Sequence, residues 1–530
     1  MTDLLIAGGL VVDGSGSAPS PATVAVQGDR IERLIRPGMA EPSAARRVDV
    51  AGRVVAPGFV DVHDHSDLSP LAEPWMDSML RQGITTVVVG NCGSSAVPPA
   101  GLAEMAGWTG LPPRELDLLD LSWTTLAGYL ERVDAARPAV NVATLVGHGA
   151  LRLQAMGDER RAPTPDELRA MRTLLARGME EGAVGLSSGL IYTPGIHATT
   201  EELVELAAAL DGVGLYASHV RGEGEPVFEA VEECIEIGRR AGVPSHVSHL
   251  KLETDLVWGR AEELLARIDE ARAAGDDVSA DQYPYPAWES ELASLLPPWA
   301  GPADLPRLLA DAGTRERLVR SVERGEPGWQ SSVRGVGWDR LVIVAHAGST
   351  EHTGRSIAEI AAATGTEPAQ AMFDLLMRDP RTSLIGHAML EDDVRTIVAR
   401  EDVMVATDGV AVSPEGPMGR FNVHPRYYGT FPRVLGRYVR EEGLLSIGAA
   451  IRKMTSLPAG RFGLAGRGRI VPGAFADLVV FDPHRIADRA TFEAPHAFPE
   501  GIELVVVNGR VAWDGERRER AGRALRRTDR

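Results

Sequence analysis

The chain has 530 residues, enough for one large barrel domain with a smaller satellite, since α/β barrels commonly take about 250 residues and more with insertions. Its 55 Lys and Arg residues against 74 Asp and Glu residues give a formal net charge of −19, which argues against a nucleic-acid partner or an anionic membrane partner. Two cysteines cannot form a disulfide framework, and no stretch approaches the roughly 20 apolar residues of a membrane helix. We therefore expect a cytoplasmic protein, and the composition carries no signal for an oligomeric state.

Both ends of the chain are rich in predicted β-strands. Residues 1–56 alternate short apolar runs with turn residues, and residues 466–483 and 502–515 show the same pattern. Because helical units lie between these regions, we expect residues 1–56 and 456–520 to pair into one small discontinuous β-sandwich. The arginine-rich tail, residues 515–530, is expected to be frayed and solvated.

Eight short apolar runs lie between the two ends, and most are separated by helix-patterned stretches. They cover residues 59–65, 85–92, 142–148, 183–188, 214–219, 244–249, 278–284 and 403–408. Eight such units predict an α/β fold, a (β/α)8 TIM-like barrel over residues 57–455. In such a barrel the active site gathers at the C-terminal ends of the strands, so polar residues from separate positions can share one pocket.

Two intervening helices carry start signals. Thr164, followed by Pro165 and Glu167, resembles a capping box with proline at the first helical position. Pro226 opens another predicted helix, which ends near Gly242.

The connection between the seventh and eighth predicted strands is too long for a simple βα loop. It contains a stretch rich in Trp and Pro, AWESELASLLPPWAGP. We interpret residues 287–400 as an insertion that forms a lid.

The candidate site residues follow the predicted strands. Those that suit a hydrolytic metal centre are His63, His65, Cys92, His219, His249, Lys251 and Asp408. Alternate strand residues point to the same side, so His63 and His65 share a face. By the same rule His249 and His246 point to opposite sides, one inward and one toward the helices. We assign His249 to the pocket, because it lies nearer the strand end, and His246 to a structural role.

Each candidate also has a structural interpretation. Cys92 could be an inert buried thiol, although its loop GNCGSS is not apolar. His219 could bond to a carbonyl group, and Asp408 could form a turn before a glycine. Three further histidines near strand-like ends are expected to lie outside the pocket: His148, His346 and His387.

The predicted ligand set suits zinc. A catalytic zinc site needs a few sulfur or nitrogen ligands and one open position, and Cys92, His219 and His249 would supply one sulfur and two nitrogens. His63 and His65 could frame a second position. A bound divalent ion lowers the pKa of its water from 15.7 to about 7, which makes amide hydrolysis feasible. Asp408 would take the proton of the water and pass it to the departing nitrogen.

Several motifs together resemble one family. They are PGFVDVHDHSD, GNCG, GAVGLSSGLIYTPG, YASHVRGEG, VSHLK, DQYPY with LLPPW, ATDG with HPRYYG, and the closing TSLPAGRFGLAGRGRIVPGAFADLVVFD. Over nearly the entire chain this sequence resembles the N-acyl-D-amino-acid deacylases, or D-aminoacylases, of the amidohydrolase superfamily.

The resemblance implies a function and roles for the site residues. It implies zinc-dependent cleavage of N-acyl-D-amino acids, with one tight zinc ion on Cys92, His219 and His249, and with His63 and His65 beside a weaker second site. It also implies that Asp408 is the general base and acid. The residues that it implies for the α-carboxylate of the small-molecule substrate are Lys251, Tyr283 and Arg426, and Arg suits a carboxylate because it binds bidentately.

Two departures from the family pattern bear on the substrate. AWES, residues 287–290, replaces a small, hydroxyl-rich run, and Glu289 brings a negative charge to the region where the side-chain pocket begins. The loop 409–423 is longer than usual, which could displace Arg426.

Two alternatives remain open. The first is a cyclic-amide or dipeptide hydrolase of the same superfamily, hydantoinase-like or dihydroorotase-like, which Cys92 disfavours. The second is a non-catalytic barrel that binds a small molecule or partner. A decayed site would have lost some ligands, whereas this sequence retains every candidate.

Overall fold

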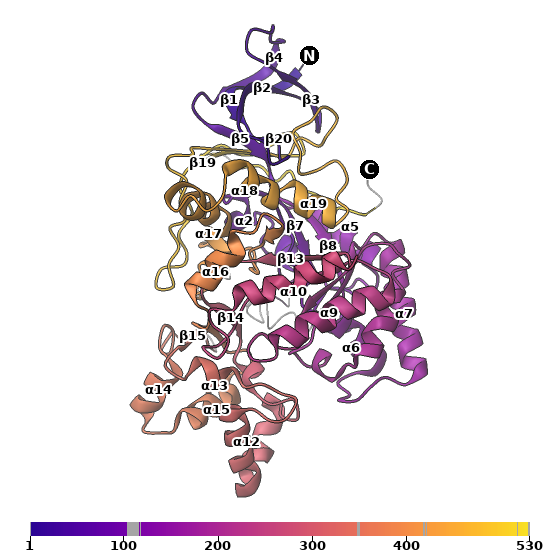
Figure 1. Ribbon diagram of the computed structural model, residues 1–530, viewed down its shortest axis with the longest axis vertical. Coiled ribbons are helices and arrows are strands. Elements are labelled where there is room, and N and C mark those ends of the chain that lie inside the picture. Colours follow the sequence, from indigo (N-terminus) through magenta and orange to yellow (C-terminus); the bar gives the residue numbers. More distant parts are fainter. Residues whose placement is uncertain are drawn as a thin grey trace.

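The computed structural model has three regions along its long axis (Figure 1). The N-terminal strands lie at one end, an α/β region lies in the middle, and a lobe formed by the segment around residues 302–378 lies at the other end. The structure describes residues 2–102, 116, 118–346, 350–416, 419, 421–516 and 518–527. Parts of three predicted segments lie outside the described residues. They are residues 347–349 of the predicted insertion, residues 417, 418 and 420 of the loop 409–423, and residues 517 and 528–530 of the tail.

Strands of the middle region pair in parallel around a ring. They are β6 (Phe59–Asp61), β7 (Ile84–Val89), β8 (Asn141–Thr144), β9 (Val146–Gly147), β10 (Gly185–Gly189), β11 (Leu215–His219), β12 (Ser245–Val247), β13 (Val278–Gln282) and β17 (Val403–Val405). Pairing runs from β6 through β7 to β8, and from β9 through β10, β11, β12 and β13 to β17. β8 and β9 form one strand interrupted at a single residue, Leu145.

Hydrogen bonds join the two runs of strands. The Leu145 N–H donates to the carbonyl oxygen of Val89 at 2.9 Å, and the Asp408 N–H donates to that of His63 at 2.8 Å. Within the described residues, the pairings therefore connect eight strand positions into a closed ring, as the sequence predicts.

His246 contacts the apolar cluster that contains Val60, Ala217 and Phe462. His246 pairs with Ala217 on the neighbouring strand, and its ring lies 5.3 Å from that of Phe462, which belongs to the same core as Ala217. The prediction that His246 and His249 point to opposite sides is therefore wrong. The strand ends at Val247, so alternation along the strand no longer applies at His249.

The C-terminal tail packs against the ring. The Leu525 N–H donates to the carbonyl oxygen of Val142 at 2.7 Å, and the Ala524 N–H donates to the carboxylate of Asp134 at 2.8 Å. The Leu525 side chain is 5% exposed in the core of the ring. The expectation of a frayed tail is wrong for residues 518–527, because apolar burial at Leu525 anchors this segment.

Helices follow most strands of the ring. They include α5 (Leu126–Ala136), α6 (His148–Met156), α7 (Pro165–Glu180), α8 (Thr200–Ala208), α9 (Val227–Ala241), α10 (Ala261–Ala273), α16 (Glu391–Val398), α17 (Arg426–Arg433), α18 (Ile447–Met454) and α19 (Ser456–Arg461). The predicted capping box is confirmed, since the Thr164 hydroxyl accepts from the Glu167 N–H while the Glu167 carboxylate accepts from the Thr164 N–H. α9 ends at Gly242, whose φ of 70° suits a residue without a Cβ atom.

The segment after β13 forms its own small sheet. β14 (Trp288–Glu291) and β15 (Leu341–Ala345) both pair antiparallel with β16 (Ser383–Gly386). The helices of the lobe are α11 (Leu305–Ala310), α12 (Ala312–Arg324), α13 (Ser332–Val336), α14 (Ile357–Thr364) and α15 (Pro368–Arg378). α16, although it lies before residue 400, packs against α10 of the central region.

Strands from both ends of the chain share one sheet. Its order is β20 (Arg510–Trp513), β19 (Ile502–Val507), β18 (Leu478–Phe481), β5 (Val54–Pro57), β1 (Thr2–Val11), β2 (Ser20–Gln27) and β3 (Arg30–Ile35), with β4 (Ala44–Asp49) also paired to β1. The indigo and yellow ribbons accordingly lie together at the upper end of Figure 1. Ile6, Val55 and Leu478 are among the apolar side chains buried against this sheet.

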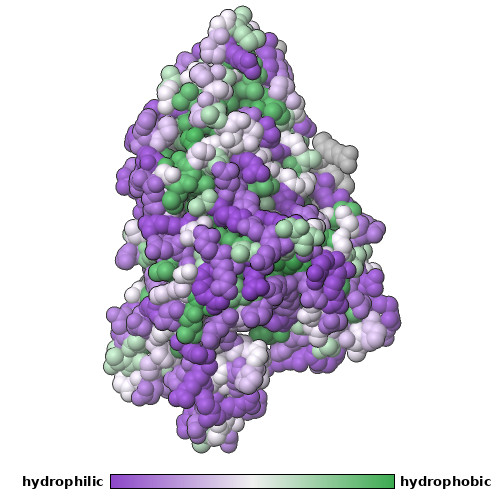
Figure 2. All heavy atoms as spheres, viewed as in Figure 1, coloured by the Kyte–Doolittle hydropathy of each residue, from purple (hydrophilic) through white to green (hydrophobic). Residues whose placement is uncertain are grey.

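The surface is mainly polar on the face drawn in Figure 2, where hydrophobic residues occur in separate groups between hydrophilic ones. None of the helices in the described part of the chain is both long and apolar enough to cross a bilayer.

Candidate active site

Three predicted ligands converge at the C-terminal ends of the ring strands. Cys92 follows β7, His219 ends β11, and His249 follows β12. The Cys92 Sγ lies 3.7 Å from His219 Nδ1 and 3.5 Å from His249 Nε2. Zinc ligands at about 2.3 Å for sulfur and about 2.05 Å for nitrogen, at a tetrahedral angle, lie about 3.6 Å apart. The two distances from Cys92 Sγ therefore match those of ligands that share one zinc ion, and all three ligand atoms lie within 4.8 Å of one another.

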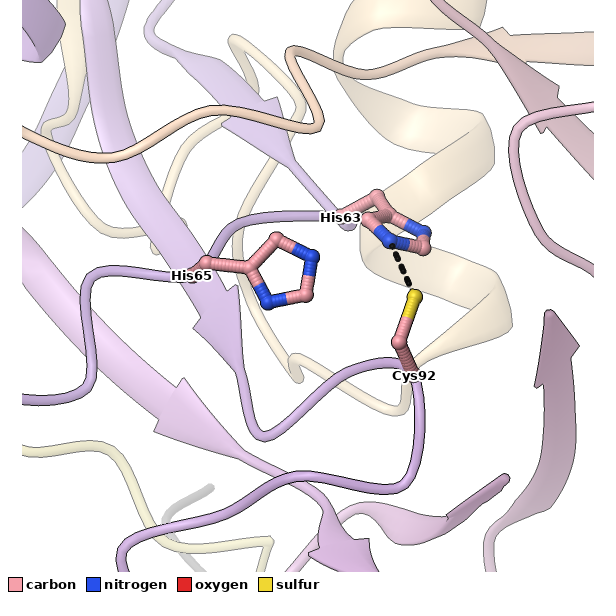
Figure 3. A group of neighbouring side chains, drawn as sticks. All are labelled: His63, His65 and Cys92. Atoms are coloured by element: carbon pink, nitrogen blue, oxygen red, sulfur yellow. Dashed lines mark hydrogen bonds between the residues drawn. The ribbon is translucent and has the colours of Figure 1, made fainter. Parts of the chain in front are cut away.

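A second group shares the same thiol. Figure 3 shows the rings of His63 and His65 beside Cys92, with His63 Nε2 at 3.3 Å from Cys92 Sγ. The Nε2 atoms of His63 and His65 lie 3.4 and 3.2 Å from Asp408 Oδ1, so both rings approach the same carboxylate, although both residues lie past the end of β6. Ligand atoms of His63, His249 and Asp408 also lie within 4.8 Å of one another. These residues offer a second cation position next to the first.

Three of these residues have strained backbones. The φ angles of Cys92, His249 and Asp408 are 51°, 36° and 48°, in the left-handed region that residues other than glycine rarely adopt. Each lies just past a strand end, where the left-handed conformation turns its side chain toward the site. Such strain costs about 1–3 kcal/mol per residue and persists only where the surroundings enforce it.

Glu223 is a charged neighbour of the ligands that the sequence analysis did not assign. Its carboxylate lies 3.1 Å from His249 Nδ1, 3.6 Å from His219 Nε2 and 2.6 Å from Lys251 Nζ. It belongs to the motif YASHVRGEG, four residues after His219. The motif alone does not distinguish it from Glu225, which is exposed and pairs with Arg334.

Asp281 is a second carboxylate that the sequence analysis missed. It lies 2.6 Å from His246 Nε2 and 3.6 Å from His63 Nδ1, and it accepts a hydrogen bond from the His249 N–H at 2.8 Å. Asp281 therefore supports both the His63 ring and the strained backbone of His249. Its only sequence signal was its place in DQYPY, at the end of the seventh predicted strand.

The buried charges favour a thiolate and a carboxylate. Burial raises the pKa of Cys92, but His63 and hydrogen bonds from His219 and His249 outweigh burial and bring the pKa well below its usual range. Burial likewise raises the pKa of Asp408, but the Arg426 guanidinium and the neighbouring imidazoles hold it well below its usual range. A metal ligand must be a thiolate, so this environment suits Cys92 for that role.

The predicted carboxylate-binding residues lie beside the metal centre. Lys251 and Arg426 line a cavity of about 1040 Å³, and Arg426 Nη1 lies 3.0 Å from Asp408 Oδ2. The long loop before Arg426 therefore does not displace it. Tyr283 is not among the described residues that line this cavity; its ring packs 4.7 Å from the Arg426 guanidinium.

Several buried polar atoms in this region have no hydrogen-bond partner among the described residues, and the Tyr283 hydroxyl and the Arg426 Nε are two of them. Unpaired buried polar atoms are costly, so these two atoms are candidates for contacts with a bound ligand.

The cavity wall includes the segment after β13. Trp288 and Glu289 of β14 line the cavity together with Ser332 of α13. Glu289 accepts a hydrogen bond from the His424 N–H at 3.0 Å. Burial raises the pKa of the Glu289 carboxyl, and the Arg426 guanidinium offsets part of that rise. A negative charge therefore stands in the cavity next to one of the two predicted carboxylate-binding cations.

The remaining histidine candidates have other surroundings. His148 Nε2 lies 2.8 Å from Glu202, His346 Nδ1 lies 2.7 Å from the Thr382 hydroxyl, and the His387 ring packs on Phe492. In the described part of the chain, none of the three lines the cavity.

Comparison with known proteins places the chain in a family. The amidohydrolase family matches residues 46–512. N-acyl-D-glutamate deacylase and D-aminoacylase of Alcaligenes xylosoxydans xylosoxydans are each 40% identical, over 99% of this chain and 96% and 98% of those proteins. A crystal structure of N-acyl-D-glutamate deacylase from Bordetella bronchiseptica, complexed with zinc and a phosphonate inhibitor, superposes with a TM-score of 0.83 at 38% identity, over 99% of each chain.

Fold and site together define an α/β ring with a candidate metal centre at the C-terminal ends of its strands. This chain belongs to the amidohydrolase family.

Proposed function

We propose that this protein is a zinc-dependent hydrolase that cleaves the N-acyl amide bond of N-acyl-D-amino acids to a D-amino acid and a carboxylate. The observation that carries the proposal is the convergence of Cys92 Sγ, His219 Nδ1 and His249 Nε2 within reach of one ion, beside the Asp408 carboxylate. Family membership and the names of the two 40% identical relatives support the reaction. The preference for the D form rests on those relatives alone.

The residues divide between two metal positions. Cys92, His219 and His249 would hold the tighter zinc ion, and His63 and His65 border a weaker second position. When bound, zinc acts as a Lewis acid toward the amide carbonyl and lowers the pKa of water to about 7.

Asp408 is the proposed proton carrier. Its carboxylate, ionised beside Arg426, accepts a proton from the attacking water and then delivers it to the amide nitrogen. This delivery is needed because an amine leaves readily only when it is protonated.

Lys251 and Arg426 are the proposed anchors for the α-carboxylate of the substrate. Both line the cavity, and each is buried with about 5% or less of its surface exposed. Tyr283 supports Arg426 through its ring, and the unpaired Nε atom of Arg426 leaves a donor for the incoming carboxylate. Anchoring the carboxylate here would place the neighbouring amide near Asp408.

A substrate panel tests the function. The zinc-loaded protein should hydrolyse N-acetyl-D-amino acids, leave the L forms nearly untouched, and show no comparable turnover of hydantoins, dihydroorotate or dipeptides. Turnover of a cyclic amide or a dipeptide at a higher kcat/KM would replace the proposal with the corresponding activity. Absence of bound zinc after purification without chelators would point to a non-catalytic barrel.

The two cysteines bear on the cellular compartment of the protein. Cys92 and Cys234 are both free and buried, and Cys92 needs its reduced form to bind a metal. We therefore place the protein in a reducing compartment, the cytoplasm.

A further inference from the structure

Glu223 lies behind both imidazoles of the tighter metal position. His219 turns Nδ1 toward Cys92 and Nε2 toward Glu223 Oε2, whereas His249 turns Nε2 toward Cys92 and Nδ1 toward Glu223 Oε1. One carboxylate thus faces the nitrogen that each ring keeps free of the metal position. His219 Nε2 makes no hydrogen bond within the described part of the chain, and Glu223 Oε2 stands 3.6 Å from it.

The position of Glu223 bears on which nitrogen of each imidazole carries the proton. A neutral histidine that binds a metal through one nitrogen carries its proton on the other, and a carboxylate that accepts this proton fixes the tautomer and the ring orientation. Because His219 and His249 use different nitrogens, they require opposite tautomers. Glu223 is placed to select both.

Lys251 makes the third contact of this carboxylate. Its Nζ lies 2.6 Å from Glu223 Oε1 and 2.8 Å from His249 Nδ1. When His249 Nε2 is a ligand, Nδ1 carries a proton that it donates to Glu223, so Lys251 cannot also donate to Nδ1. Its donors are then directed to Glu223 and to the cavity that it lines.

We infer that Glu223 is a positioning residue, which orients both ligand imidazoles of the zinc site and connects them to the substrate-binding Lys251. The inference rests on the proposed zinc site, but it does not depend on which amide is hydrolysed. Glu223 touches no reacting atom in this scheme and acts through His219, His249 and Lys251.

The chain offers a matched control in Glu202. This carboxylate is also buried, at 3% exposed, and it also joins a histidine to a cation, with 2.8 Å to His148 Nε2 and 2.7 Å to Arg152 Nη1. In the described part of the chain it contacts no candidate metal ligand. Glu202→Gln therefore reproduces the loss of a buried carboxylate without touching the metal centre.

The test compares zinc affinity in Glu223→Gln, Glu202→Gln and Lys251→Met. Zinc dissociation is measured by competition with a chromophoric chelator, and the Co²⁺-substituted proteins are examined for their thiolate charge-transfer and visible bands. Removing a carboxylate that orients a metal ligand typically weakens metal binding by about 10–100-fold. We expect that loss and an altered Co²⁺ spectrum in Glu223→Gln, with the apo protein melting within a few degrees of wild type.

The other variants separate positioning from charge. Glu202→Gln should lower the melting temperature but leave zinc affinity within about twofold of wild type. Lys251→Met should raise KM while changing zinc affinity far less than Glu223→Gln does. Wild-type zinc affinity and an unchanged Co²⁺ spectrum in Glu223→Gln would overturn the inference. An equal loss of zinc affinity in Lys251→Met would also overturn it, because zinc binding would then depend on the net charge near the site and not on the orientation of the imidazoles.

A second variant at the same position keeps the inference testable if the first variant does not fold. If Glu223→Gln does not fold, Glu223→Asp keeps the charge but withdraws the carboxylate by one methylene from both imidazoles. Weaker zinc binding in Glu223→Asp supports positioning, and wild-type binding overturns it. If the wild-type protein binds zinc but hydrolyses no N-acyl amino acid, the proposed function fails while these comparisons still decide the role of Glu223.

Discussion

Arg426 Nη1 lies 3.0 Å from Asp408 Oδ2, so the proposed proton carrier and one proposed substrate anchor form an ion pair. A second ion pair, Lys251 with Glu223, repeats the pattern at 2.6 Å. Each cation that is expected to receive the substrate carboxylate is thus already bonded to a carboxylate of the metal centre. We therefore expect substrate binding and the metal site to be coupled through these two ion pairs.

Asp408→Asn should abolish most activity while zinc remains bound. The amide has nearly the same shape but cannot accept and return a proton, and loss of general acid–base catalysis typically costs about 10²–10⁴-fold in rate. The measurements are kcat with N-acetyl-D-amino acids and zinc content by elemental analysis. Retention of more than about a tenth of the wild-type kcat would remove Asp408 from its proposed role.

Arg426→Met should affect substrates with a free carboxylate more than substrates without one. We expect kcat/KM for N-acetyl-D-leucine to fall by about 10–100-fold, since hydrogen bonds to charged groups contribute about 1.5–3 kcal/mol. The matched substrate is the corresponding carboxamide, which lacks the charge and should lose much less kcat/KM, only the part that comes from the contact of Arg426 with Asp408. An equal loss for both substrates would show that Arg426 serves Asp408 rather than the carboxylate.

Removing the metal should remove the activity reversibly. Prolonged chelation of the wild-type protein should abolish hydrolysis, and one equivalent of zinc should restore it. Cys92→Ser replaces a thiolate ligand with a hydroxyl group that stays protonated, so zinc affinity should fall by at least about tenfold. Full activity of the chelated protein, at a verified zinc content near zero, would contradict the proposed mechanism.

Glu289 should act against acidic substrates. Two like charges about 10 Å apart at an effective dielectric constant of about 20 repel by about 1.7 kcal/mol. Glu289→Gln should therefore raise kcat/KM for N-acetyl-D-glutamate relative to N-acetyl-D-leucine by about tenfold. Glu229→Gln is the control, because Glu229 lines the same cavity but is exposed. Identical selectivity in wild type and Glu289→Gln would exclude this role.

Lys453 predicts a pH dependence of stability. It is 1% exposed and donates hydrogen bonds to the carbonyl oxygens of Val398 and Arg400 at the end of α16. Burial lowers the pKa of Lys453 from 10.5 to about 7. Because the folded-state value lies below the unfolded value, the unfolded chain binds more protons between these pH values, and stability rises with pH across this window.

Lys453→Met should remove that rise. The comparison is the difference in melting temperature between about pH 7 and pH 9.5 for the two proteins, which should be smaller in the variant. Parallel pH curves would show that Lys453 stays charged in the folded protein, held by its two carbonyl partners.

Much of the candidate site could be predicted from the sequence, because strand ends are local features. Cys92, His219 and Asp408 each end or follow an apolar run, and eight parallel strands bring such positions together whatever the intervening helices contain. The terminal sheet was predictable for the same reason, since turn residues and alternating apolar residues mark its strands at both ends of the chain.

Other features depend on contacts between distant residues. Alternation along the strand failed for His246 and His249, because Val247 ends the strand and a left-handed residue follows. Arg526 and its neighbours gave no sign of order, because the tail is held by Val142 and Asp134, more than 380 residues away.

The sequence by itself determined which donor atoms are available and at which strand ends they stand, since residue type and apolar periodicity are written locally. Only the tertiary structure decided that Glu223 and Asp281 stand behind the imidazoles and that Arg426 reaches Asp408 despite its long loop. The physical reason is that a hydrogen bond or ion pair depends on separation in space, which the closed ring of strands sets and spacing along the chain does not.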